Sequence, residues 1–236
     1  MESIEKGYNK MRKKIMFIAV HPYDETLGCG GTILRHKTDE DEIYWLILTE
    51  PTVRHYSQEF VNKRKTLLPK ISKEYGFNDF YFLGFPAQRL HAIDMQEFIV
   101  KIDYVINKIQ PNIIYVMFNN DVHSDHRIAF EAVYSCTKSF RKPYINTIYM
   151  YETLSETEFA PALQSTSFVP NVYIDITPYM QKKLEIMAMY DTELMQEPYP
   201  RSLGSIEALA RFRGSRCGVK YAEAFMLLYH YCPTEI

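Results

Sequence analysis

Residues 14–32 read KIMFIAVHPYDETLGCGGT, and this stretch decides the fold class. It begins with an unbroken apolar run from Ile15 to Val20, which is typical of a strand buried on both faces of a parallel sheet. Polar residues and a proline follow. We expect a glycine-rich turn region over residues 21–31, and then a short amphipathic helix that ends near His36. The first unit of the chain is therefore predicted to be a strand, a polar turn and a helix.

Strands and helices continue to alternate along the rest of the chain. We expect further strands at residues 42–49, 80–83, 112–118, 145–152, 172–176 and 222–231, and helices at 57–75, 94–110, 126–139, 178–190 and 201–213. Pro69 predicts a kink or a break in its helix. This order predicts an α/β fold with a mainly parallel sheet and helices on both faces. No repeat or flexible linker divides the chain, so we expect one domain over residues 1–236.

Composition places the chain among ordinary globular proteins. Hydrophobic residues make up 47% and charged residues 24%, which excludes global disorder. The formal net charge of −2 gives no general attraction to nucleic acid or to an anionic membrane. No apolar run approaches the roughly 18 residues of a membrane span. Four cysteines without metal-binding spacing indicate free thiols in a reducing compartment, and we expect a cytoplasmic protein.

Two polar loops follow predicted strands, HPYDE at residues 21–25 and DVHSDHR at residues 121–127. The carboxyl ends of parallel strands meet at one edge of a sheet, so these loops are expected to converge. Histidine and carboxylate ligands suit zinc, which takes three protein ligands in catalytic sites, and they also suit iron, cobalt or manganese. His21, Asp24 and His126 could share such an ion. The alternative is that these loops only cap helices, with Asp125 as an N-cap.

The glycine-rich segment GCGGT at residues 28–32 invites comparison with phosphate-binding loops. It lacks both the GxGxxG spacing and the GK[ST] ending of those loops. We interpret it as close packing where the chain enters a helix, with Cys29 as a small buried residue. The missing dinucleotide fingerprint also argues against a dehydrogenase.

The two polar loops resemble the motifs of the PIG-L/LmbE family of zinc-dependent N-deacetylases. HPYDE at 21–25 with LGCGGT at 27–32 is similar to the family's HPDDE…LGCGGT signature, and HSDHR at 123–127 is similar to its HxDH(R) motif. The resemblance covers about residues 14–230. It implies a Rossmann-like α/β sandwich that removes N-acetyl groups from N-acetylglucosamine (GlcNAc)-type sugars or their conjugates.

The resemblance also implies a role for each matching residue. His123 matches the histidine that stabilises the tetrahedral intermediate or protonates the leaving amine, and Asp125 matches the acid that orients that histidine. Arg64 resembles the arginine that contacts the substrate. The zinc ligands correspond to His21, Asp24 and His126.

Tyr23 departs from the family pattern, because the family has its general base, an aspartate, at this position. Tyrosine has a pKa near 10 and is protonated at pH 7, so it is a poor base but a good hydrogen-bond donor. Three routes remain for the proton: metal activation of the water alone, an acid (Asp121, favoured over Glu25), or His123. Loss of a general base typically costs about 10²–10⁴ in rate. Ala87 replaces a frequent family aspartate, which affects the choice of substrate.

We therefore expect a deacetylase with Zn²⁺, or another divalent metal such as Fe²⁺, that acts on a small-molecule N-acetylated sugar or sugar conjugate at reduced rate. The alternative is a catalytically impaired protein of the same fold that binds metal and sugar. Neither hypothesis involves a nucleic-acid partner. Both are compatible with a homo-oligomer.

Overall fold

A computed structural model describes residues 12–232 and 234, so the ends of the predicted 1–236 domain lie outside the described residues. Seven strands pair into one sheet in the order β3-β2-β1-β4-β5-β7-β6. β1 to β5 pair in parallel, and β7 lies antiparallel between β5 and β6, which confirms the predicted mainly parallel α/β fold. The strands are β1 Lys14–Ala19, β2 Glu42–Glu50, β3 Asp79–Pro86, β4 Ile113–Met117, β5 Thr147–Tyr151, β6 Val172–Asp175 and β7 Ala222–His230.

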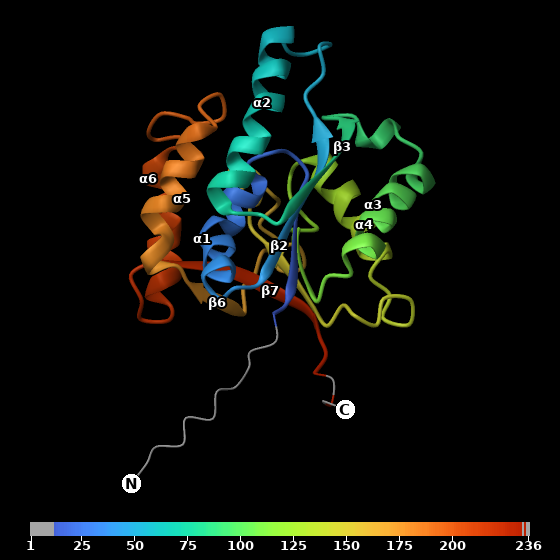
Figure 1. The fold of residues 1–236 in the computed structure, drawn as a ribbon. Coiled ribbons are helices and arrows are strands. Elements are labelled where there is room, and N and C mark those ends of the chain that lie inside the picture. The colour runs from blue at the N-terminus through green and yellow to red at the C-terminus, as the bar shows by residue number, and fades with distance from the viewer. Residues whose placement is uncertain (1–11, 233, 235–236) are drawn as a thin grey trace.

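Helices cover both faces of this sheet, as Figure 1 shows. Helices α1, α2, α5 and α6 lie on one face, and α3 and α4 lie together on the other. The helix expected to reach residue 139 ends at Ser135. The helices are α1 Asp24–Thr38, α2 Gln58–Tyr75, α3 Met95–Ile109, α4 Ser124–Ser135, α5 Met180–Met189 and α6 Leu203–Ser215, with short 3₁₀ turns at Leu90–Ala92 and Thr177–Tyr179.

The central strands are apolar throughout because helices cover them on both sides. All five residues of β4 are buried, and so are five of the six in β1. The Phe17 and Tyr115 rings stack between these two strands with centroids 4.7 Å apart. The chain runs outward from β1 to β2 and β3 and then returns to β4, on the other side of β1. The strand order therefore reverses between β1 and β4, where open α/β sheets form a ligand-binding crevice.

The glycine-rich segment lies inside a helix, so the predicted turn over residues 21–31 is wrong beyond residue 23. Helix α1 begins at Asp24 and presses closely against its neighbours. A Cβ added at Gly28 would lie 2.3 Å from Tyr151 Cδ2, and one at Gly31 would lie 2.5 Å from Ile176 Cβ. Glycine is required here because no side chain fits, and this outweighs its poor helix propensity. The interpretation as close packing is confirmed.

Charged residues from the end of the chain tie α1 to the sheet. Glu223 on β7 accepts hydrogen bonds from the backbone N–H groups of Gly31 and Thr32, at 2.9 and 2.8 Å. Lys183 on α5 donates to Glu223 at 2.7 Å and to the Leu27 carbonyl at 2.8 Å. Both charged side chains are buried, so each neutralises the other inside the core.

Helix α2 is not broken at Pro69, contrary to one of the two outcomes expected for that residue. It continues from Gln58 to Tyr75 and ends at Gly76, which adopts a left-handed conformation with φ 73°. Pro69 lies on the exposed face of the helix, whereas Leu68 and Ile71 are buried. The buried apolar stripe stabilises the helix against the roughly 3 kcal/mol cost of an interior proline.

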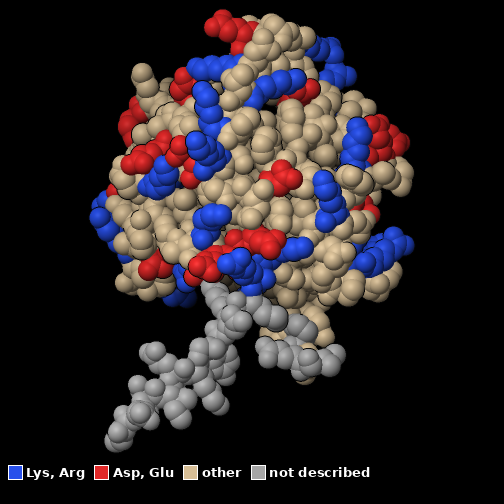
Figure 2. Space-filling model, in the orientation of Figure 1, with Lys and Arg blue, Asp and Glu red and all other residues tan. Residues whose placement is uncertain are grey.

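The surface carries both charge signs. Figure 2 shows Lys and Arg interspersed with Asp and Glu on one face, in keeping with the net charge of −2. Among residues 12–232 and 234, no helix combines the length and the apolar character that crossing a membrane requires.

Candidate metal centre and catalytic site

Three of the predicted site residues meet at the crevice between β1 and β4. His21 follows β1, Asp24 opens α1 and His126 lies in the first turn of α4. Asp24 Oδ2 lies 3.6 Å from His21 Nδ1 and 3.3 Å from His126 Nε2, and these two nitrogens are 3.4 Å apart. All three side chains are buried. We refer to them as the ligand trio.

The ligand trio fits a tetrahedral metal ion. With metal–ligand bonds of about 2.0–2.1 Å, such an ion holds its ligand atoms about 3.3 Å apart, close to the three separations found here. Asp24 Oδ1 is also buried without a hydrogen-bond partner among the described residues. An unpaired buried carboxylate oxygen is costly unless a cation or a donor approaches it. The donor set of two imidazoles and one carboxylate is that of many catalytic metal sites.

The pKa values of the ligand trio also indicate that a positive charge is stabilised at this position. Burial alone would lower the pKa of His126, but the carboxylates of Asp24 and Asp121 raise it to about 10. Burial would raise the pKa of Asp24, but His126 and His21 hold it below its usual range. In the metal-free protein a proton on His126 therefore supplies the positive charge between these carboxylates.

Asp121 lies behind His126, on the side of the ring away from the ligand trio. Its Oδ2 is 2.8 Å from His126 Nδ1, and its Oδ1 accepts a hydrogen bond from Thr157 Oγ at 2.6 Å. Asp121 is buried and both of its oxygens are engaged. The geometry therefore does not support its expected role as the carboxylate that accepts the proton of the attacking water. Asp121 orients His126 instead, as outer carboxylates do in metal sites.

Asp125 lies beside His21 and does not cap a helix with its side chain, so the capping alternative is wrong at this residue. Its carboxylate accepts hydrogen bonds from the backbone N–H groups of Gln88 and Leu90, at 2.6 and 3.1 Å. Its Oδ2 lies 3.7 Å from His21 Nε2. Asp125 therefore faces the nitrogen of His21 that points away from the ligand trio. Its hydrogen bond to His123, the histidine that Asp125 was expected to orient, comes from the backbone N–H.

His123 is the N-cap residue of α4, and its ring lies against two members of the ligand trio. The centroid of the His123 ring is 4.6 Å from that of His21 and 5.2 Å from that of His126. Its Nδ1 accepts a hydrogen bond from the backbone N–H of Asp125 at 3.1 Å. That contact places the proton of the neutral ring on Nε2. Burial, and then the nearby His21 and His126, lower the pKa of His123 to about 4, which favours this neutral form.

Tyr23 has an unusual backbone, with φ 126°, directly before α1. Its N–H donates to Glu25 Oε2 at 3.1 Å, and Glu25 also accepts the hydroxyl of Tyr190 at 2.9 Å. The Tyr23 ring lies beside that of His21, with centroids 6.2 Å apart. Burial, and then the nearby Asp24, raise the pKa of Tyr23 well above its ordinary value, so the phenol keeps its proton. Glu25 is engaged in holding this turn.

A cleft opens beside His21 and Tyr23, bounded by aromatic and apolar side chains that include Tyr56, Phe60 and Ala87. Arg64 also lines this cleft, and its expected contact with the substrate stays a prediction. Its guanidinium donates to the Pro22 carbonyl at 3.0 Å and pairs with Glu193.

The sequence of this chain matches a family model over residues 16–137, described as PIG-L, GlcNAc-PI de-N-acetylase. The chain belongs to the PIG-L family. The matched region contains both polar loops and all of the site residues predicted from them, so the resemblance seen in the motifs is confirmed at the level of the family.

Proteins of other organisms align with almost the whole chain. A diacetylchitobiose deacetylase of Thermococcus kodakarensis is 23% identical over 98% of this chain and 90% of its own length. The structure of a conserved protein from Thermus thermophilus superimposes with a TM-score of 0.75 at 21% identity, covering 94% of this chain and 97% of that one. An N,N'-diacetylchitobiose deacetylase of Pyrococcus horikoshii gives 0.74 at 20% identity, over 93% and 85% of the two chains. These structures establish the common fold.

Some residues of the PIG-L site carry no signal in the sequence. Glu193 pairs with Arg64 across 129 positions, and Thr157 reaches Asp121 across 36. The backbone amides of Gln88 and Leu90 that hold Asp125 are likewise independent of side-chain identity. These contacts depend on where each loop lies in the fold, which the identity of a polar loop residue does not reveal.

Proposed function

We propose that this protein is a metal-dependent hydrolase that removes the N-acetyl group from a small-molecule GlcNAc-type sugar or sugar conjugate, with zinc as the metal. The main support for this proposal is the ligand trio, whose three donor atoms lie 3.3–3.6 Å from one another. The family model that the chain matches is described as a de-N-acetylase. Fe²⁺ is the alternative ion that the same donors suit.

The chain's own residues would prepare the site in two ways. A divalent ion held by the ligand trio would supply charge that polarises the acetamide carbonyl and lowers the pKa of a water toward about 7. Asp121 would keep the Nε2 of His126 directed toward the other two members of the trio, through its 2.8 Å contact with His126 Nδ1. Asp125 would restrain the far side of His21 in a similar manner.

His123 would stabilise the negative oxygen of the tetrahedral intermediate. In its neutral form it presents Nε2–H as a donor, because Nδ1 accepts the Asp125 N–H. Tyr23, which keeps its proton, would offer a second donor from its hydroxyl. In this tautomer Nε2 of His123 accepts no proton, so we assign it to the oxyanion and not to the base.

The base normally expected in this family has no evident replacement among the acids considered. Asp121 is engaged with His126 and Thr157, and Glu25 with Tyr23 and Tyr190. We therefore propose a slow enzyme, reduced by about 10²–10⁴ relative to one with a general base. The competing hypothesis is a protein that binds metal and sugar without hydrolysis.

Acetate release tests the proposal. Wild-type protein and Tyr23→Asp are assayed with N-acetylglucosamine and diacetylchitobiose, and bound metal is measured on the same samples. We expect about one metal per chain in both, slow release by the wild type, and a gain of about 10²–10⁴ in Tyr23→Asp. Metal binding with release only by Tyr23→Asp would favour the impaired binding protein. A His126→Ala variant that keeps both its bound metal and its hydrolytic activity would refute the assigned site.

A further inference from the structure

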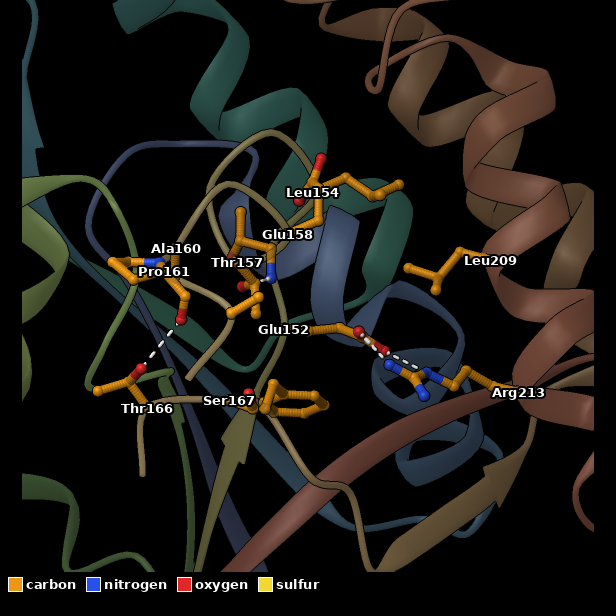
Figure 3. Close-up of a pocket in the computed structure, with 13 residues that line it drawn as sticks. Glu152, Leu154, Thr157, Glu158, Ala160, Pro161, Thr166, Ser167, Leu209 and Arg213 are labelled. Carbon is orange, nitrogen blue, oxygen red and sulfur yellow. Dashed lines mark hydrogen bonds and ion pairs between the residues drawn. The ribbon is translucent and has the colours of Figure 1, made fainter. Parts of the chain in front are cut away.

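A second cavity lies near the crevice and shares no lining residue with the cleft beside Tyr23. It has a volume of about 270 Å³ and lies between the segment that follows β5 and helix α6. Figure 3 shows Glu152 and Thr157 from the first of these facing Leu209 and Arg213 from the second. The volume is slightly below the range of about 300–1,000 Å³ typical of pockets for drug-sized ligands, so it suits a small one.

One wall of this cavity is a neutralised ion pair. Arg213 donates to both oxygens of Glu152, from Nε at 2.8 Å and from a terminal nitrogen at 2.6 Å (Figure 3). The guanidinium carbon also lies 5.8 Å from the centre of the Phe168 ring. An ion or a charged ligand would have to compete with this planar pair, whereas a hydroxyl group could bond to either partner and leave the pair intact.

The remaining lining offers the Glu158 carboxylate, which accepts a hydrogen bond from the Ser155 N–H, and hydroxyl groups. The Oγ of Thr153 is fully buried, so a ligand in the cavity does not reach it. Thr166 and Ser167 donate to backbone carbonyls of their own loop, which leaves their oxygens as acceptors. The hydroxyl oxygens of Thr166 and Ser167 are therefore the acceptors that this part of the lining offers to the hydroxyl groups of a ligand.

We propose that this cavity binds one uncharged pyranose ring. Such a ring has a C–H face to lie against Phe168 and Leu209, and a rim of hydroxyls that both donate and accept. Glu152, Thr166 and Ser167 would accept from that rim, and Arg213 would donate to it. The mixture of apolar surface with a few converging polar groups is that of a small-molecule site.

The cavity is connected to the metal centre through one wall residue. Thr157 lines the cavity and donates to Asp121, which holds His126. A bound sugar that moved the Thr157 loop would therefore alter the residue that orients a metal ligand.

Sugar binding is tested on the full chain by NMR with labelled leucine methyl groups. D-glucose is the probe, because it carries no acetamide and is not a substrate of the proposed reaction. We expect the Leu154 and Leu209 methyl signals to shift with saturation at millimolar glucose, while that of Leu203, at the start of α6, stays fixed. The absence of shifts at Leu154 and Leu209 would overturn the proposal.

Matched variants locate the binding. Leu209→Trp fills the cavity and should abolish the Leu154 shift, whereas Ala208→Trp adds the same indole on the exposed side of α6 and should preserve it. Ser167→Ala removes one acceptor hydroxyl from the lining, and should weaken glucose binding about fivefold by removing one hydrogen bond. An unchanged glucose affinity in both Leu209→Trp and Ser167→Ala would also overturn the proposal.

The ring could be a free sugar or the second ring of a substrate. If Leu209→Trp raises KM for diacetylchitobiose but not for N-acetylglucosamine, the ring belongs to the substrate. If glucose binding is lost in that variant while both KM values stay unchanged, the cavity serves a free sugar.

Discussion

The contact between Asp121 and His126 predicts how tightly the site holds its metal. Asp121 is buried, and it bonds to His126 Nδ1 at 2.8 Å and to Thr157 Oγ at 2.6 Å. In Asp121→Asn the amide oxygen would still accept from His126, and the amide nitrogen would turn toward Thr157. The geometry survives, but a charge-assisted hydrogen bond becomes a neutral one.

The magnitude follows from that exchange. Charge-assisted bonds contribute about 1.5–3 kcal/mol and neutral ones about 0.5–1.5 kcal/mol, so the loss is about 1–1.5 kcal/mol. Metal affinity should therefore fall about tenfold, since 1.4 kcal/mol corresponds to a factor of ten. Asp121→Ala also frees the His126 ring to rotate and should cost about 100-fold, the upper end for outer residues of metal sites.

The assay is competition for Zn²⁺ against a chelator of known affinity, at fixed pH. Denaturation of the metal-free variants separates a loss of metal binding from a loss of fold. Glu131→Gln, at an exposed position of α4, serves as a control for the change of charge. An Asp121→Ala variant that stays folded and binds Zn²⁺ as tightly as wild type would refute the assignment of Asp121 as the orienting residue.

Three further predictions concern the metal, the glycines and the buried ion pair. Because Asp24 and Asp121 outweigh burial and raise the pKa of His126 to about 10 from 6.5, metal must displace a proton, and the Kd should fall about tenfold per pH unit between about pH 6 and pH 8. The same shift stabilises the metal-free fold fully below pH 6.5 and is lost as pH rises through about 10; a Kd independent of pH in calorimetry would contradict this account. Gly28→Ala forces a Cβ to within 2.3 Å of Tyr151 and should lower the free energy of unfolding by about 1–3 kcal/mol in urea denaturation, where no change would show that α1 can shift. Lys183→Met leaves the Glu223 charge unpaired in the core and should cost about 3–5 kcal/mol, with partial recovery in the double variant Lys183→Met/Glu223→Gln; equal stability of the two would argue against the pairing.

The sequence predicted the elements whose signal is local. The short unbroken apolar run Ile15–Val20 predicts a strand that is buried on both faces. The convergence of the two polar loops follows because parallel strands end at the same edge of the sheet. The glycines of α1 misled the prediction because their conformational preference suggests a turn. Their real cause is contact with Tyr151 and Ile176, which lie more than a hundred positions away along the chain.

In the candidate site, too, the sequence predicted what depends on local spacing and missed what depends on the direction of a side chain. The spacing of His21 and Asp24 within one loop suggested shared metal binding, and the fold places them 3.6 Å apart. The task of Asp121 was mistaken because sequence gives proximity but not direction. Its two carboxyl oxygens are engaged by His126 Nδ1 and by Thr157, and not by a water at the metal position.

The bonds from Glu223 to α1 impose an order on biosynthesis. The helix that begins with Asp24 has two backbone N–H groups whose acceptor is encoded 191 and 192 residues later. At about 5–20 residues per second, the ribosome needs roughly 10–40 s to add that stretch. During that interval a nascent chain carries the loop at residues 21–25 and the helix that follows it without the strand that secures them.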